Sequence, residues 1–220
     1  MTMSDPFESC AAEYDRWYDS EKGKTIYENE ARCIKKLIES CCKDKILEVG
    51  VGTGRFAVLS KNVFGVDRAF SPLEIAKQRG IPVVQAKAES LPFRDKTFSC
   101  VMFIVTLPFV ENIYLTLKEA KRVLEDEGRI IVGEVFLDSK LGSVYEEKKT
   151  KGHPFYRLAK FYSFTEFQKI LYQCGLKSEK VFGTLKEYPF QNPECEEAEE
   201  IDMKNFSDLP AFVCMEIKKW

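Results

Sequence analysis

The sequence predicts an α/β protein in which a mainly parallel sheet is covered by helices on both faces. Two observations support this fold class. Short apolar runs alternate with segments of helical spacing along most of the 220 residues, as strands and crossover helices do in such proteins. The apolar run at residues 45–49 is followed by glycines at positions 50, 52 and 54, and then by a segment that can start a helix. This order is typical of a ligand-binding turn.

The first half of the chain alternates between expected helices and strands. Asp5 can cap a helix that begins at Pro6 and carries Tyr14, Trp17 and Tyr18, and Glu8 stands at the capping-box position. A second helix is expected at residues 27–41. Strands are expected at 45–49, 62–67 and 83–86, with a short helix after the glycines and another at 72–79.

The second half begins with an unbroken apolar run at residues 98–105, as expected for a central strand buried on both faces. Asn112 can cap a helix that runs to Leu124 and is stopped by Gly128. Ser163 and Glu166 form a capping box for another helix, which Gly175 ends. Strands are expected at 128–136, 181–185 and 211–217, an acidic loop at 192–205, and an irregular cap or binding loop at 137–162.

Composition narrows the class of protein. The length and the 45% of hydrophobic residues fit one domain spanning 1–220. A net charge of −2 gives no support for nucleic acid as a partner. The longest apolar run is too short for a membrane span. Eight cysteines without a C-x-x-C pair, and no signal-peptide pattern, favour a cytoplasmic protein with reduced thiols, and a single histidine argues against a metal site.

The glycine spacing separates this turn from two other nucleotide-binding turns. A dinucleotide fingerprint would need a glycine at Arg55, and a P-loop would need a later Gly-Lys-Ser/Thr. Instead, Glu48-x-Gly50-x-Gly52-x-Gly54 resembles the first motif of the class I S-adenosylmethionine-dependent methyltransferases, in particular the type 11 group. The resemblance extends from about Tyr14 to about Gly175. It implies a Rossmann-like, seven-stranded, mostly parallel sheet whose last strand is antiparallel and lies between the fifth and sixth.

The resemblance also implies a cofactor site for S-adenosylmethionine. In the family the glycine loop wraps the methionine part, and the acid corresponding to Glu48 reaches its amino end. Asp67 follows the second strand, where a carboxylate can accept hydrogen bonds from ribose hydroxyls. The expected cofactor-binding residues are Tyr14, Glu48, Gly50, Gly52, Gly54, Asp67, Arg68, Ala88, Glu89, Phe103 and Ile104.

One position departs from the family pattern around adenine. The stretch from Lys87 to Phe93 resembles the family's D-A-E-x-L-P-F, but a lysine stands where an aspartate is usual. A lysine only donates hydrogen bonds, so it cannot accept one from the adenine amino group. Glu89 or water would have to take that role.

The expected activity is methyl transfer to a small-molecule acceptor. No catalytic residue is identified, and Glu111, Glu134, His153 and Tyr14 are the candidate bases. The expected substrate pocket contains Tyr18, Phe109, Glu134, His153 and Tyr156, and residues 1–24 and 137–162 are expected to form lids over it. Two alternatives remain open: a methyltransferase for protein or RNA side groups, and a cofactor-binding regulatory protein without turnover. The oligomeric state is not predicted.

Overall fold

The computed structural model describes residues 5–187, 195–203 and 208–220. Its first half contains helices α1 to α4, the 3-10 helix η1 and strands β1 to β3. In chain order these are α1 (Pro6–Ser9), α2 (Ala11–Trp17), α3 (Glu21–Cys41), β1 (Ile46–Val49), η1 (Ala57–Leu59), β2 (Val63–Asp67), α4 (Phe70–Gln78) and β3 (Val83–Gln85).

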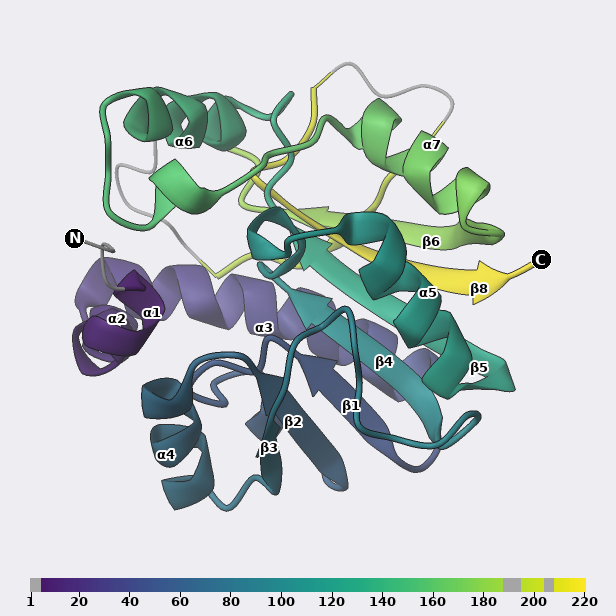
Figure 1. The fold of residues 1–220 in the computed structure, drawn as a ribbon. Helices are drawn as coiled ribbons and strands as arrows, with labels where there is room; N and C mark the ends of the chain where they lie inside the picture. Colours follow the sequence, from purple (N-terminus) through teal and green to yellow (C-terminus); the bar gives the residue numbers. More distant parts are fainter. Residues whose placement is uncertain (1–4, 188–194, 204–207) are drawn as a thin grey trace.

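The second half contributes the other strands and the helices that cover them (Figure 1). These elements are β4 (Phe98–Ile104), η2 (Leu107–Phe109), α5 (Ile113–Val123), β5 (Leu124–Glu134), α6 (Lys140–Thr150), η3 (Tyr156–Leu158), α7 (Phe164–Gln173), β6 (Leu176–Thr184), β7 (Glu199–Glu200) and β8 (Phe212–Lys219).

The strands form one sheet in the order β3-β2-β1-β4-β5-β8-β6-β7. The chain starts at β1, extends to β2 and β3 on one side, and then crosses to β4 and β5 on the other side, with all five strands parallel. The strand order therefore reverses between β1 and β4. Ligands of open α/β sheets bind at the carboxyl ends of the strands beside such a reversal.

The predicted fold class is confirmed, including the antiparallel last strand. β8 lies between β5 and β6 and is antiparallel to both. Among the described residues the sheet has one strand more than predicted, the two-residue β7, which pairs with Phe182 and Gly183. Its two glutamates are exposed and lie in the segment expected to be an acidic loop. Their pairing depends on a distant strand, so the local sequence gave no sign of it.

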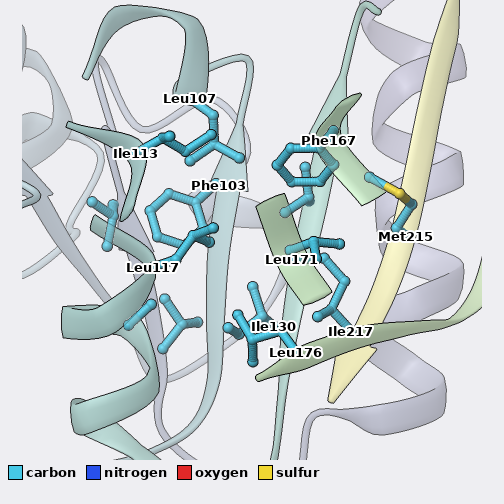
Figure 2. Close-up of a cluster of buried hydrophobic side chains, with 14 of the residues drawn as sticks. Phe103, Leu107, Ile113, Leu117, Ile130, Phe167, Leu171, Leu176, Met215 and Ile217 are labelled. Atoms are coloured by element: carbon cyan, nitrogen blue, oxygen red, sulfur yellow. The ribbon is translucent and has the colours of Figure 1, made fainter. Parts of the chain in front are cut away.

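The sheet separates two hydrophobic cores. Along β4, Phe98, Val101 and Phe103 face the core under α5 and α7, whereas Cys100, Met102 and Ile104 face the core under α3 and α4. Figure 2 shows the first of these cores, with Phe103, Leu117 and Phe167 among its members. This alternation explains why the β4 segment is apolar throughout.

Three predicted helix caps are present. The side chain of Asp5 accepts the Phe7 N–H at 3.0 Å, Asn112 accepts the N–H groups of Tyr114 and Leu115, and Ser163 accepts the Glu166 N–H. These contacts begin α1, α5 and α7 where the sequence indicates.

Several predicted boundaries were wrong. The helix expected after Asp5 is broken at Cys10 into α1 and α2. The strand expected from Gly128 already begins at Leu124, and the strand expected from Val181 begins at Leu176, because cross-strand pairing extends both. The segment 137–162 was expected to be irregular, but it contains the eleven-residue α6. The charged residues of α6 face solvent for much of its length, which hides the helical period.

The expectation that all thiols are reduced was also wrong. Cys33 of α3 and Cys214 of β8 form a disulfide, and both residues are fully buried. They are 181 positions apart in the sequence, so no spacing pattern could indicate the pair. The packing of α3 across the back of the sheet brings them together.

No helix in the described ranges is long and apolar enough to cross a membrane.

Candidate active site

A cavity of about 320 Å³ lies at the carboxyl ends of β1, β2 and β4, beside the reversal of strand order. The glycine loop after β1 forms one wall, and the segments after β3 and β4 form others. Phe7, Ala11 and Tyr14 from α1 and α2 close it from the N-terminal side. The predicted residues that line it are Tyr14, Tyr18, Glu48, Gly50, Gly52, Asp67, Arg68, Ala88, Glu89, Ile104, Phe109 and Glu111.

The glycine loop needs glycine for different reasons at different positions. Gly50 has φ +73°, and a Cβ there would lie 2.2 Å from Cγ2 of Thr106, so the loop packs directly on the segment after β4. Gly52 has φ +52° and no atom within 4 Å of its Cβ position, so it faces open space. Gly54 is not part of the cavity wall. Its Cβ position faces α4 instead, 3.2 Å from Cβ of Ala76. It allows the helix and the loop to pack closely.

Glu48 is buried at the end of β1, and its Oε2 atom has no hydrogen-bond partner among the described residues. Burial raises the pKa of Glu48 well above its ordinary range, and the nearby charge of Asp67 raises it further. An unpartnered buried carboxylate is costly, so its partner is expected to be a ligand. A cationic group such as an ammonium fits this position.

Asp67 is held in place by backbone donors. Its Oδ2 atom accepts the Gly52 N–H and its Oδ1 atom accepts the Ala69 N–H, both at 2.9 Å. Burial raises its pKa, while these N–H groups act in the opposite direction. A carboxylate oxygen has more than one acceptor site, so Asp67 can still accept hydrogen bonds from a ligand in the cavity.

The lysine that departs from the family pattern is paired at the mouth of the cavity. Lys87 Nζ lies 2.8 Å and 3.0 Å from the two carboxylate oxygens of Glu111, and both side chains are exposed. Lys87 lowers the pKa of Glu111, which makes this glutamate a poor base. Glu89 accepts the Asn112 N–H at 3.0 Å, so part of its acceptor capacity supports the start of α5.

The N-terminal helices are anchored by Asp15, a residue that the sequence did not single out. Its carboxylate accepts hydrogen bonds from Thr53, Arg55 and Arg79, at 2.6 to 3.0 Å. Burial alone would raise the pKa of Asp15, but these donors hold it well below its usual range. Arg68 binds Asp5, and Glu8 accepts the N–H groups at the start of α4. These partners lie far apart in sequence, so only the folded chain brings them together.

Four further predicted residues lie outside the cavity. Phe103 was expected to contact the cofactor, but its side chain is fully buried in the core under α5, on the opposite face of β4 from Ile104. Glu134, His153 and Tyr156 were expected in the substrate pocket. They belong to a second cluster beside Tyr14 and Tyr18, described below.

Burial shifts the pKa of each of the remaining candidate bases. Tyr14 is 37% exposed as a whole residue, but removal of its hydroxyl from water raises its pKa to about 12, and this hydroxyl hydrogen-bonds that of Tyr18 at 3.1 Å. Burial also raises the pKa of Glu134 to about 8. It lowers the pKa of His153, with a contribution from Lys148. At neutral pH, His153 can therefore accept a proton more readily than Tyr14 can.

The sheet order, the glycine loop and the acidic residues after β1 and β2 define a class I methyltransferase. Residues 47–132 match the family described as "Methyltransferase domain". The chain belongs to the S-adenosylmethionine-dependent methyltransferases of class I, in the type 11 group. Its cofactor is accordingly S-adenosylmethionine.

Three relatives illustrate the similarity. A solved structure from Thermotoga maritima, described as an S-adenosylmethionine-dependent methyltransferase and possible histamine N-methyltransferase, is 35% identical with a TM-score of 0.86. The match covers 97% of this chain and 98% of that one. An uncharacterized protein from Methanocaldococcus jannaschii is 38% identical over 97% of this chain and 98% of its own length. An uncharacterized Mycobacterium tuberculosis protein is 36% identical over 76% of this chain, which spans 58% of that protein.

Proposed function

We propose that this methyltransferase acts on a small organic acceptor that binds beneath the N-terminal helices. The observation that carries the methyltransferase part of this proposal is the unpartnered Oε2 atom of Glu48, which lies at the end of β1 and lines the same cavity as Gly52. This carboxylate fits the ammonium group of the cofactor's methionine part. The cavity that Glu48 lines has a volume typical of small-molecule sites.

The chain's own residues have separate roles in this proposal. Glu48 accepts from the ammonium group, the turn at Gly50 and Gly52 leaves room for the methionine part, and Asp67 accepts from the ribose hydroxyls. When bound, the cofactor supplies a methyl group already activated by the positive sulfur. The protein therefore mainly has to align the acceptor atom and exclude water from it.

The residues that line the cavity favour a small-molecule acceptor over a protein or RNA acceptor. Phe7, Tyr14, Phe109 and Leu158 line the cavity, so part of its wall is aromatic and apolar. A wall of this kind favours an acceptor that can be enclosed. The net charge of −2 gives no general attraction for RNA.

The first test is cofactor binding. S-adenosylhomocysteine should bind the parent protein in calorimetry, and Gly52→Arg should abolish binding because the new side chain fills the open space. Gly80→Arg is a matched control, since Gly80 also has positive φ (+81°) and no atom within 4 Å of its Cβ position, but does not line the cavity. Equal binding by the parent and Gly52→Arg would contradict the assignment of the loop.

The second test is the acceptor. Methyl-labelled S-adenosylmethionine should be incubated with the protein and with separate metabolite, protein and RNA fractions of a cell extract. Label is expected in the metabolite fraction. Label in protein or RNA alone would contradict the small acceptor, and cofactor binding without transfer in any fraction would contradict enzymatic turnover.

A further inference from the structure

Two buried glutamates, Glu30 of α3 and Glu134 at the carboxyl end of β5, lie near enough for the charge of Glu30 to raise the pKa of Glu134. A Cβ on Gly133 would lie 2.7 Å from Cδ1 of Ile34, so α3 crosses β5 at this point. Glu30 is one helical turn before Ile34, and Glu134 directly follows Gly133. Helical residues four positions apart share a face, so Glu30 lies on the side of α3 that is turned toward the end of β5. Glu30 is 6% exposed and Glu134 is 5% exposed.

Among the described residues, the carboxyl group of Glu134 is not fully satisfied, and no ion pair or hydrogen bond is found for that of Glu30. Glu134 Oε1 accepts only the N–H of the adjacent Val135, and its Oε2 atom has no partner among the described residues. Within the described ranges, no lysine, arginine or hydrogen-bond donor contacts Glu30. Burial alone raises the pKa of Glu30 to about 8. Burial, with a contribution from Glu30, raises the pKa of Glu134 to about 8 as well. Such buried acids indicate a site built for a ligand.

Four tyrosines form two ring pairs, one from the N-terminal helices and one from the segment after β5. Tyr14 and Tyr18 come from α2 and its end, with ring centroids 5.6 Å apart, and Tyr145 and Tyr156 stack at 4.4 Å. Burial is the main cause of the raised pKa of each tyrosine, and the charge of Glu30 contributes to all four. The ring of Phe155 connects the two pairs, because it lies 5.6 Å from the ring of Tyr14 and 6.2 Å from that of His153.

Two other titratable groups adjoin the tyrosines. The His153 ring lies 4.7 Å from that of Tyr156, and its buried Nδ1 atom has no partner among the described residues. The ammonium of Lys148 lies 5.7 Å from the rings of both Tyr145 and Tyr156, so these rings already face one cation.

We propose that Glu30, Glu134, Tyr14, Tyr18, Tyr145 and Tyr156 form a subsite for the cationic ammonium group of the acceptor, which makes the substrate an organic amine. The carboxylates supply negative charge, and the tyrosine rings supply the electron-rich faces that attract cations. Tyr14 and Tyr18 line both this subsite and the cofactor cavity, so a seated amine lies next to the site of transfer. The proposal rests on the methyltransferase function proposed above.

The test uses two cationic probes and one neutral probe. Benzylamine, which is cationic at pH 7, tetramethylammonium and neutral benzyl alcohol are titrated into protein saturated with S-adenosylhomocysteine. The cations should bind at least ten-fold more tightly than the alcohol. Because both glutamates must lose protons to face the cation, calorimetry in buffers of different ionisation enthalpy should show proton release on binding.

Substitutions of the two glutamates test where the cations bind. Glu30→Gln and Glu134→Gln should each weaken the binding of both cations at least ten-fold and reduce the proton release. Glu39→Gln is the matched control, because Glu39 is an exposed glutamate on the same helix. The affinity for S-adenosylhomocysteine should be the same in all variants, which shows that the fold and the cofactor site are intact.

Three results would overturn the inference: no binding of either cation to the parent, equal binding of benzylamine and benzyl alcohol, or unchanged cation binding in both glutamine variants. Failure of the proposed function gives different results: the parent would not bind S-adenosylhomocysteine, or the labelling experiment would show methyl transfer to protein or RNA alone or to no fraction.

Discussion

At the scale of single residues, Glu30 and Glu134 make the stability of the empty protein depend on pH. Burial raises both pKa values from the ordinary 4.5 to about 8, so the folded state prefers the protonated acids. Their contribution is therefore fully present below pH 4.5 and is lost as the pH rises to about 8. The upper limit of this loss is about 1.4 kcal/mol per pH unit for each group.

The double variant Glu30→Gln, Glu134→Gln tests this dependence. Its free energy of unfolding should fall less steeply between pH 5 and pH 8 than that of the parent, as measured by urea unfolding at each pH. Glu39→Gln should behave as the parent. Parallel pH curves for the parent and the double variant would mean that these acids are not buried in the protonated form.

At the scale of elements, α2 is fastened to the glycine loop through Asp15. Thr53 and Arg55 belong to the loop region, and Arg79 follows α4, so one carboxylate joins three segments. Replacing Asp15 with alanine leaves the two arginines without this partner and should release α1 and α2 from the sheet. Hydrogen exchange in residues 5–18 should then become faster while β4 stays protected.

The same measurement tests whether the N-terminal segment acts as a lid. In the parent, S-adenosylhomocysteine should slow exchange in residues 5–18, which contribute to the cavity wall, and in α6, which carries Tyr145 of the adjoining tyrosine pair. Glu13→Ala, an exposed change on α2, should have no effect. If residues 5–18 are as protected as β4 without ligand, these helices are fixed packing elements and not a lid.

At the scale of the whole molecule, the Cys33–Cys214 disulfide joins α3 to the inserted strand β8. It closes most of the chain into a loop, which reduces the freedom of the unfolded state. The double variant Cys33→Ala, Cys214→Ala should lower the free energy of unfolding by about 2–5 kcal/mol. Denaturant unfolding measures this, with Cys195→Ala, an exposed free cysteine, as the control.

Two checks accompany the disulfide variant. Mass spectrometry of the non-reduced protein should find the Cys33–Cys214 peptide pair. Cofactor affinity should be unchanged, because neither cysteine lines the cavity. Equal stability of the parent and the double variant would show that the bond does not contribute.

The sequence by itself determined the fold class and the centre of the site. The β1 run, the glycine loop and the acid after β2 are local patterns, since period, glycine spacing and strand ends are set by neighbouring residues. The pattern therefore predicted Glu48, Gly50, Gly52 and Asp67 at one edge of the sheet. The antiparallel last strand came from the family resemblance, and the strand order confirms it.

Only the tertiary structure decided the contacts between distant segments. Asp15 reaches Arg79, Cys33 reaches Cys214, and the helix that carries Glu30 crosses the strand that ends in Glu134. The two residues or segments of each pair are more than sixty residues apart, so the local hydrophobic periodicity cannot predict their contact. The side of β4 that Phe103 faces was likewise decided by packing against α5. The cofactor motif is thus local in sequence, whereas the subsite proposed for the acceptor is assembled from four separate parts of the chain.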